Sequence, residues 1–118
     1  VCSVDECCFA VTRDLFLRLL FNERICDGWH LYAVELCYRA MTQCNIPSYV
    51  LPDSIYHKMN GSVGLSTDTS FLMTVWKIAR EYKNNVTRIY SPCYIVSTSF
   101  IPCLLKIGRT FLKNLIRL

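Results

Sequence analysis

Two stretches of the chain repeat apolar residues at spacings of three and four, which is the pattern of one face of an α-helix. The first stretch runs from Trp29 to about Cys44, and the second runs from Ser66 to Lys83. The apolar positions are Leu31, Val34, Tyr38 and Met41 in the first stretch, and Phe71, Val75, Ile78 and Tyr82 in the second. Each stretch therefore predicts an amphipathic helix with one buried face.

Short polar residues mark the expected starts of the helices. Asp27 precedes the first helix as the expected N-cap, and Ser66 or Thr67 is placed to cap the second. A shorter helix is predicted over Arg13–Leu20, with Thr12 as its N-cap.

Three further segments indicate extended chain. The apolar stretch 1–11, VCSVDECCFAV, predicts a strand, and so does 46–52, while 87–96 is also expected to be extended. Strands and helices then alternate along 118 residues, which predicts an α/β fold of one domain's size. The chain begins abruptly at Val1, so we expect a fragment of a longer protein.

Residues 100–118 predict a basic amphipathic helix. One side carries Lys106, Arg109, Lys113 and Arg117, and the other carries Leu104, Leu105, Phe111, Leu112, Leu115 and Ile116. The charges come too early for a membrane-spanning helix. Such a helix closes its own domain, docks on a protein groove, or lies on a membrane surface. The net charge is only +4 and no nucleic-acid-binding motif appears, so we expect no nucleic-acid partner.

The eight cysteines do not follow the spacing of a metal module. No Cys-x-x-Cys pair exists, and Cys7 and Cys8 are adjacent, which argues against a zinc site. We expect free, mostly buried thiols and a reducing, cytoplasmic location, with the basic tail as a candidate membrane contact.

Three places in the sequence hold residues suited to chemistry. Asp5-Glu6 interrupts an apolar run, where carboxylates are costly unless they face a cleft or solvent. The start of the first long helix carries Asp27, Trp29, His30, Tyr32 and Glu35. A carboxylate or His there suits a base acting on a hydroxyl, and the alternative is a capping Asp, a packed Trp and a surface His. His57 suits a metal ligand, a phosphate contact or a structural hydrogen bond.

The order of three phrases resembles the family 2 glycosyltransferases, which have the GT-A fold. These phrases are VDECCFAVTRDLF, LLFNERICDGWHLYAVELCYRA and YVLPDSIYHKMNGSVG, and the resemblance covers about residues 1–90. It implies a C-terminal, acceptor-side part of a catalytic domain over 1–95, followed by the basic tail over 96–118. It also implies sugar transfer from a nucleotide-diphosphate donor to a glycan or other hydroxyl acceptor, with Mn or Mg as the cofactor.

The resemblance assigns roles to the same residues. Asp5 and Glu6 match an acidic motif of the acceptor pocket, Trp29 and Tyr32 suit stacking on a sugar ring, and His57 matches a metal or diphosphate contact. Ala33 stands where the family keeps its base. Either Asp27, His30 or Glu35 replaces that base, or the chain is a non-catalytic α/β binding module whose basic tail docks on a membrane or a partner.

Overall fold

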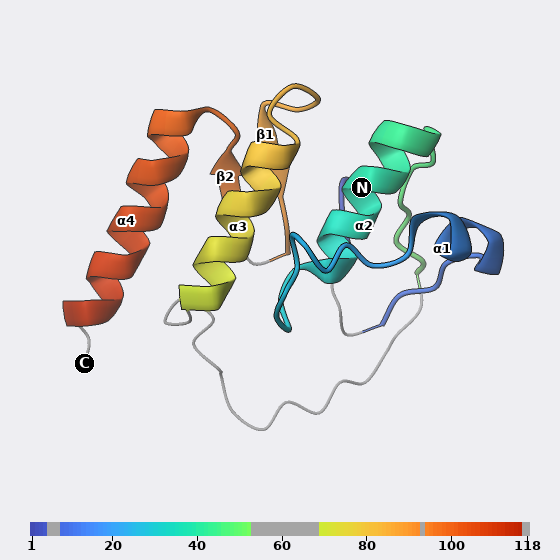
Figure 1. The fold of residues 1–118 in the computed structure, drawn as a ribbon, viewed down its shortest axis with the longest axis horizontal. Coiled ribbons are helices and arrows are strands. Elements are labelled where there is room, and N and C mark those ends of the chain that lie inside the picture. The colour runs from blue at the N-terminus through green and yellow to red at the C-terminus, as the bar shows by residue number, and fades with distance from the viewer. Residues whose placement is uncertain (5–7, 53–68, 93, 117–118) are drawn as a thin grey trace.

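The protein has a small mixed α/β fold. The structure, a computed structural model, describes residues 1–4, 8–52, 69–92 and 94–116. Over these residues the elements are α1 (Arg13–Leu19), α2 (Tyr32–Cys44), α3 (Thr69–Glu81), β1 (Arg88–Tyr90), β2 (Ile95–Ser97) and α4 (Phe100–Ile116). Along the longest axis, α4 lies at one end and α1 at the other, with α3, the two strands and α2 between them (Figure 1).

Helix α1 is short and has no buried residue, so its two ends depend on outside groups. At its start the Thr12 side chain accepts a hydrogen bond from the Leu15 amide at 3.4 Å, which confirms the predicted cap. At its end the Arg39 guanidinium donates to the carbonyls of Leu19 at 3.0 Å and Leu20 at 2.7 Å. A cation is favourable there because the last carbonyls of a helix lack backbone partners.

Helix α2 begins three residues later than predicted, and Asp27 is not its N-cap. The N-cap is Leu31, which has a left-handed backbone (φ 65°) and makes no side-chain capping bond. The Asp27 carboxylate is instead engaged by Lys77 of α3. The helix ends conventionally at Asn45, a residue type that tolerates the left-handed conformation of a C-cap.

The core lies between α2, α3 and the sheet, and it contains the predicted helix faces. Leu31, Val34 and Tyr38 of the first face are buried, and Met41 packs against them half-buried. The second face is buried throughout, at Phe71, Val75, Ile78 and Tyr82. The amphipathic periodicity therefore identified both inner faces correctly.

The predicted extended segment 87–96 forms an antiparallel hairpin. Ile89 of β1 and Val96 of β2 lie opposite each other, and both side chains are buried. Ser91 closes the turn, because its hydroxyl donates to the Tyr94 carbonyl and accepts from the Tyr94 amide, both at 2.9 Å. The Tyr90 amide donates to the Tyr38 hydroxyl at 2.7 Å, which ties β1 to α2.

The two other predicted strands are wrong for the residues that the structure describes. Residues 1–4, 8–11 and 46–52 join no sheet. Pro47 and Pro52 explain the second error, because each lacks the N–H that a ladder needs. The N-terminus makes isolated contacts instead: the Val1 ammonium donates to the Ser48 carbonyl at 2.9 Å.

Helix α4 packs on α3 and β2. Its contact side is small: Cys103 is fully buried and Ile107 is half-buried against the core. Near its start, the Phe100 ring meets the Trp76 ring edge-on at 5.3 Å between centroids. The expected boundary between the domain part (1–95) and the basic tail (96–118) falls inside β2 (Ile95–Ser97). The tail segment therefore contributes part of a strand to the hairpin.

Candidate functional site

Asp27, the first residue of the expected catalytic cluster, is held by a lysine. Its Oδ2 atom accepts a hydrogen bond from Lys77 Nζ at 2.7 Å, while 64% of the Asp27 side chain stays exposed. This hydrogen bond is the largest cause that lowers the pKa of Asp27, and the positive charge of Lys77 acts in the same direction. A carboxylate with a lowered pKa is a weaker base, so this geometry favours a link between the segment before α2 and α3 over proton abstraction.

The aromatic members of the cluster separate into different surroundings. Trp29 is 90% exposed, whereas the half-buried Tyr32 ring lies edge-on to Phe21 at 5.3 Å. His30 is half-buried, and its ring meets the Phe71 ring edge-on at 5.5 Å. Of these three side chains, Trp29 therefore offers the most free surface to a ligand.

Glu35 lies in the core, with only 1% of its side chain exposed. Its Oε1 atom accepts hydrogen bonds from the Tyr82 hydroxyl at 2.9 Å and from Asn22 Nδ2 at 3.2 Å. Its Oε2 atom accepts one from Arg39 Nη2 at 2.9 Å. This burial leaves almost no carboxylate surface for a substrate, so the geometry favours a structural role for Glu35.

Sequence reasoning missed this buried polar cluster of Asn22, Glu35, Arg39 and Tyr82. The Glu35–Arg39 spacing of four residues was the available signal, because residues at that spacing meet on a helix. Burial is the largest cause that raises the pKa of Tyr82, and the negative charge of Glu35 adds to it. The phenol therefore stays protonated and donates to the carboxylate.

Asp5, Glu6 and His57 lie outside the described residues, as do the expected caps Ser66 and Thr67. Where the structure describes the chain, no three His, Cys, Asp or Glu side chains come together as metal ligands. The metal role of His57 stays a prediction.

The cysteines are less enclosed than expected. All six that the structure describes are free thiols: Cys26 and Cys103 are buried, Cys37 and Cys44 are half-buried, and Cys2 and Cys8 are exposed. Burial raises the pKa of Cys103, and the nearby Arg80 charge opposes that shift. Cys103 therefore serves packing, because a thiol with a raised pKa is a poor nucleophile.

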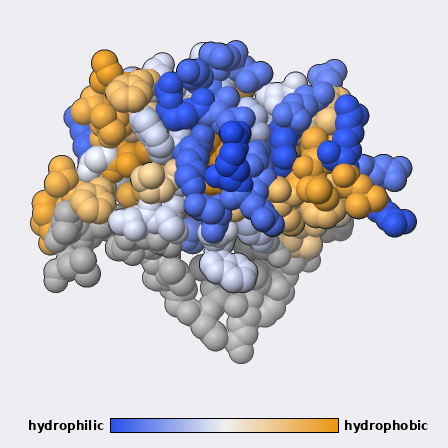
Figure 2. Space-filling model, viewed as in Figure 1, coloured by the Kyte–Doolittle hydropathy of each residue, from blue (hydrophilic) through white to orange (hydrophobic). Residues whose placement is uncertain are grey.

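Helix α4 carries an exposed apolar stripe on the side opposite its buried Cys103. We call Ile101, Leu105, Leu112 and Ile116 the outer stripe. They recur at spacings of four, seven and four and therefore share one side of the helix. Their exposed fractions are 68, 56, 58 and 84%. The sequence had placed Leu105, Leu112 and Ile116 on one apolar face, and the structure leaves that face uncovered among the described residues (Figure 2).

Three cations border the outer stripe along one side. We call Lys106, Arg109 and Lys113 the basic edge; all three are exposed. Within the part of the chain that the structure describes, none of the three is in an ion pair. Residues 82–118 contain six Lys or Arg and no Asp or Glu, whereas residues 1–81 contain seven cations and nine acids. Positive charge is thus concentrated in the segment that carries the exposed apolar surface.

Comparison with known proteins adds no family. No known protein family, curated protein sequence or solved structure matches the chain. The described helices include none with both the length and the hydrophobicity to cross a membrane.

Proposed function

We propose that this chain is a non-catalytic α/β docking module that attaches to an anionic membrane surface through α4. The observation that carries the proposal is the outer stripe, which is apolar and exposed, with the basic edge beside it. An amphipathic helix of this composition lies in the plane of a membrane, with its apolar side among the acyl chains and its cations among the headgroups.

The charges favour a lipid surface over a second copy of the chain. Two copies that paired through the outer stripe would bring two basic edges together, and α4 contains no acid to neutralise them. Anionic lipids supply the missing negative charge. Each Lys or Arg near such a surface contributes about 1 kcal/mol of attraction.

The apolar contribution is of similar size. Leu105 and Leu112 each expose more than half of their surface. Transfer of a leucine side chain from water to an apolar medium contributes roughly 1.5–3 kcal/mol when it is complete. The outer stripe and the basic edge together therefore support the proposal of reversible attachment to an anionic membrane.

Flotation with lipid vesicles tests the proposal. We expect binding to vesicles that contain phosphatidylserine, and weak binding to neutral phosphatidylcholine vesicles. The double variant Leu105→Gln/Leu112→Gln removes apolar contact, and Lys106→Gln/Arg109→Gln/Lys113→Gln removes the charge. The charge variant should lower the partition coefficient on the order of 100-fold at low salt, since three contributions of about 1 kcal/mol are lost.

Helix α1 supplies matched controls. Leu17 is 57% exposed, close to the values of Leu105 and Leu112, so Leu17→Gln is a control for loss of exposed leucine. Arg13→Gln/Arg18→Gln is the corresponding charge control. Equal losses in the α1 and α4 variants would contradict the proposal. Absence of binding to anionic vesicles would also overturn it, as would tighter binding to single-stranded RNA.

The resemblance to family 2 glycosyltransferases supports a second proposal, the acceptor-side part of a GT-A sugar transferase. The favourable observation is Trp29, whose exposed indole offers a flat apolar face for a sugar ring. The test is turnover of nucleotide-sugar donors, with Mn or Mg, by a longer chain that includes the upstream donor-binding part. Asp5→Ala and His57→Ala should each lower turnover at least about tenfold. No turnover by the longer chain would remove this proposal.

A further inference from the structure

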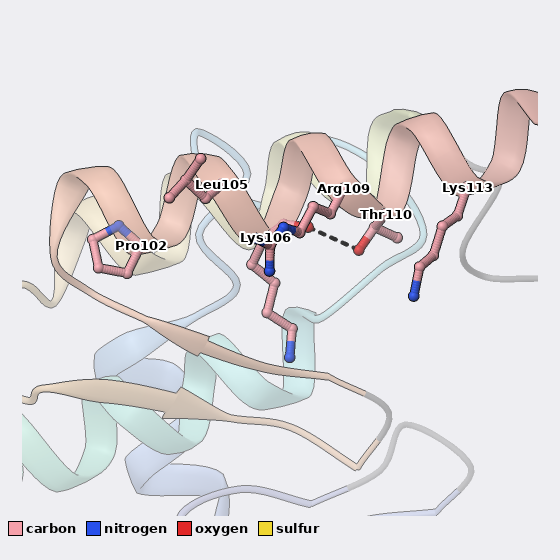
Figure 3. Close-up of a pocket in the computed structure, with 6 residues that line it drawn as sticks. All are labelled: Pro102, Leu105, Lys106, Arg109, Thr110 and Lys113. Carbon is pink, nitrogen blue, oxygen red and sulfur yellow. Dashed lines mark hydrogen bonds between the residues drawn. The ribbon is translucent and has the colours of Figure 1, made fainter.

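A shallow hollow of about 430 Å³ runs along the side of α4 that carries the basic edge. It is lined by Pro102, Leu105, Lys106, Arg109, Thr110 and Lys113 (Figure 3). The hollow is open to solvent, and all of its lining residues belong to α4. Figure 3 shows the amino groups of Lys106 and Lys113 extending from the same side of the helix, with Thr110 between them.

A second hollow of about 310 Å³ adjoins the first and shares Lys106 with it. Its other lining residues are Ser91, Pro92, Tyr94 and Ile95 of the hairpin. The first hollow lies on the surface of α4 and the second lies between Lys106 and the hairpin; we call the two adjoining hollows together the α4 groove.

Tyr94 holds the two sides of the α4 groove together. The hydroxyls of Tyr94 and Thr110 are hydrogen-bonded at 3.0 Å, and Thr110 also donates to the Lys106 carbonyl at 2.9 Å. Lys106 Nζ lies 5.1 Å from the centre of the Tyr94 ring, within the range of a cation–π contact. These contacts place Lys106 at the junction of the hollows, so Tyr94 is a positioning residue.

The spacing of the basic edge suits a ligand with more than one negative group. From Lys106 to Lys113 the helix advances about 10 Å, at roughly 1.5 Å per residue. A phosphodiester headgroup carries one negative charge on its phosphate, whereas a phosphomonoester carries about −1.5 to −2 at pH 7. Three unpaired cations beside one hollow therefore match two phosphomonoesters better than one diester.

We infer that the α4 groove binds the headgroup of a lipid that carries phosphomonoesters, such as a phosphorylated inositol lipid. The inference rests on the proposed function, because the outer stripe next to the groove must enter the same membrane. The planar guanidinium of Arg109 suits bidentate contact with a phosphate, and the lysines act as point charges on either side of it. Attachment to the membrane would then select particular lipids.

Two measurements on the full chain separate this inference from the proposed function. The first compares vesicles that contain phosphatidylinositol bisphosphate with vesicles that contain phosphatidylserine at equal total charge. We expect at least roughly tenfold tighter binding to the bisphosphate vesicles, because the cations of the groove would contact the phosphates directly, in addition to the general attraction of the charged surface. Arg109→Gln should abolish this preference, whereas Lys83→Gln, an exposed cation outside α4, should keep it.

The second measurement is calorimetric titration with soluble inositol trisphosphate. The variant Ile101→Gln/Leu112→Gln, at two outer-stripe positions that do not line the groove, should lose vesicle binding and keep this soluble binding, because the basic edge remains. Tyr94→Phe should weaken soluble binding by roughly two- to tenfold through loss of the Thr110 contact, without removing any cation.

The outcomes are distinguishable. Equal affinity for the two kinds of charged vesicle would overturn the headgroup inference and leave membrane attachment in place. Absence of binding to both kinds would overturn both proposals, even if inositol trisphosphate still bound, since the groove would then take free phosphate esters instead of lipids.

Discussion

The Tyr82 hydroxyl donates a hydrogen bond of 2.9 Å to the Glu35 carboxylate inside the core. This bond joins α2 to the residue that directly follows α3, which are far apart in the sequence. The carboxylate also accepts a hydrogen bond from Arg39. The same guanidinium donates a hydrogen bond to the Leu19 carbonyl at the end of α1. One acidic side chain thereby connects three parts of the fold.

Tyr82→Phe tests the contribution of this hydrogen bond to stability. The substitution keeps the ring and leaves the hydrogen bond from Asn22 to Glu35 Oε1 in place. We expect a loss of about 1–3 kcal/mol in the free energy of unfolding, measured by urea denaturation, because a buried acceptor loses a donor. Tyr49→Phe is the control, since Tyr49 is 74% exposed. Similar values for the two variants would contradict a structural role for the bond.

Arg39→Met should be more damaging than Tyr82→Phe. It removes the cation that faces a buried carboxylate and the donor to the Leu19 and Leu20 carbonyls, so we expect a loss of about 3–5 kcal/mol. Arg39→Lys keeps the charge but not the fork of donors, and it should lose less.

The measurement is again the urea midpoint, with Arg18→Met on exposed α1 as the control. A loss within about 0.5 kcal/mol for Arg39→Met, as expected for Arg18→Met, would show that the guanidinium does not hold α1 in place.

The raised pKa of Tyr82 predicts alkaline sensitivity. The folded protein keeps the Tyr82 proton at pH values where the unfolded chain, with a pKa of about 10, releases it. Stability is thus unaffected by this group below about pH 10 and falls above it, by up to about 1.4 kcal/mol per pH unit. Tyr82→Phe should show a shallower decline between pH 9 and 11, on the order of that slope. Parallel declines in the two proteins would refute this.

Paired substitutions on α4 test which side of the helix packs. Leu105→Ala, on the outer stripe, should change the free energy of unfolding by less than about 0.5 kcal/mol. Ile107→Ala should lower it by about 1 kcal/mol or more, because Ile107 is half-buried against the core. The reverse order would mean that the outer stripe is buried and unavailable for docking.

The sequence predicted the long helices well and their surroundings less well. The faces of α2 and α3 followed from periodicity, because Val34 and Ile78 lie at positions that can reach a core from one side only. The start of α2 was wrong because local rules favour Asp27 as a cap, whereas a tertiary partner, Lys77, takes its carboxylate. Leu31 then caps the helix in a conformation that its residue type does not favour.

The sequence did not specify which face of α4 packs on the core, or which of the candidate site residues are exposed. Periodicity showed that Leu105 and Leu112 share a face, but it does not say which face meets the core. In the structure, the side of α4 that carries Cys103 packs on α3 and β2, and the leucine face is exposed. The sequence likewise grouped Trp29 and Glu35 in one candidate cluster, and only the tertiary contacts show that Trp29 is exposed and Glu35 is buried.

The concentration of cations in residues 82–118 has a consequence for how the protein approaches a charged surface. The molecule is 45 Å long, whereas an electrostatic field in 0.1 M salt decays over about 10 Å. Near an anionic bilayer, the end that carries α4 is attracted while the end that carries α1 experiences little potential (Figure 1). Under the proposed attachment, the resulting torque would turn the molecule before contact, so that α4 would arrive first more often than random orientation allows.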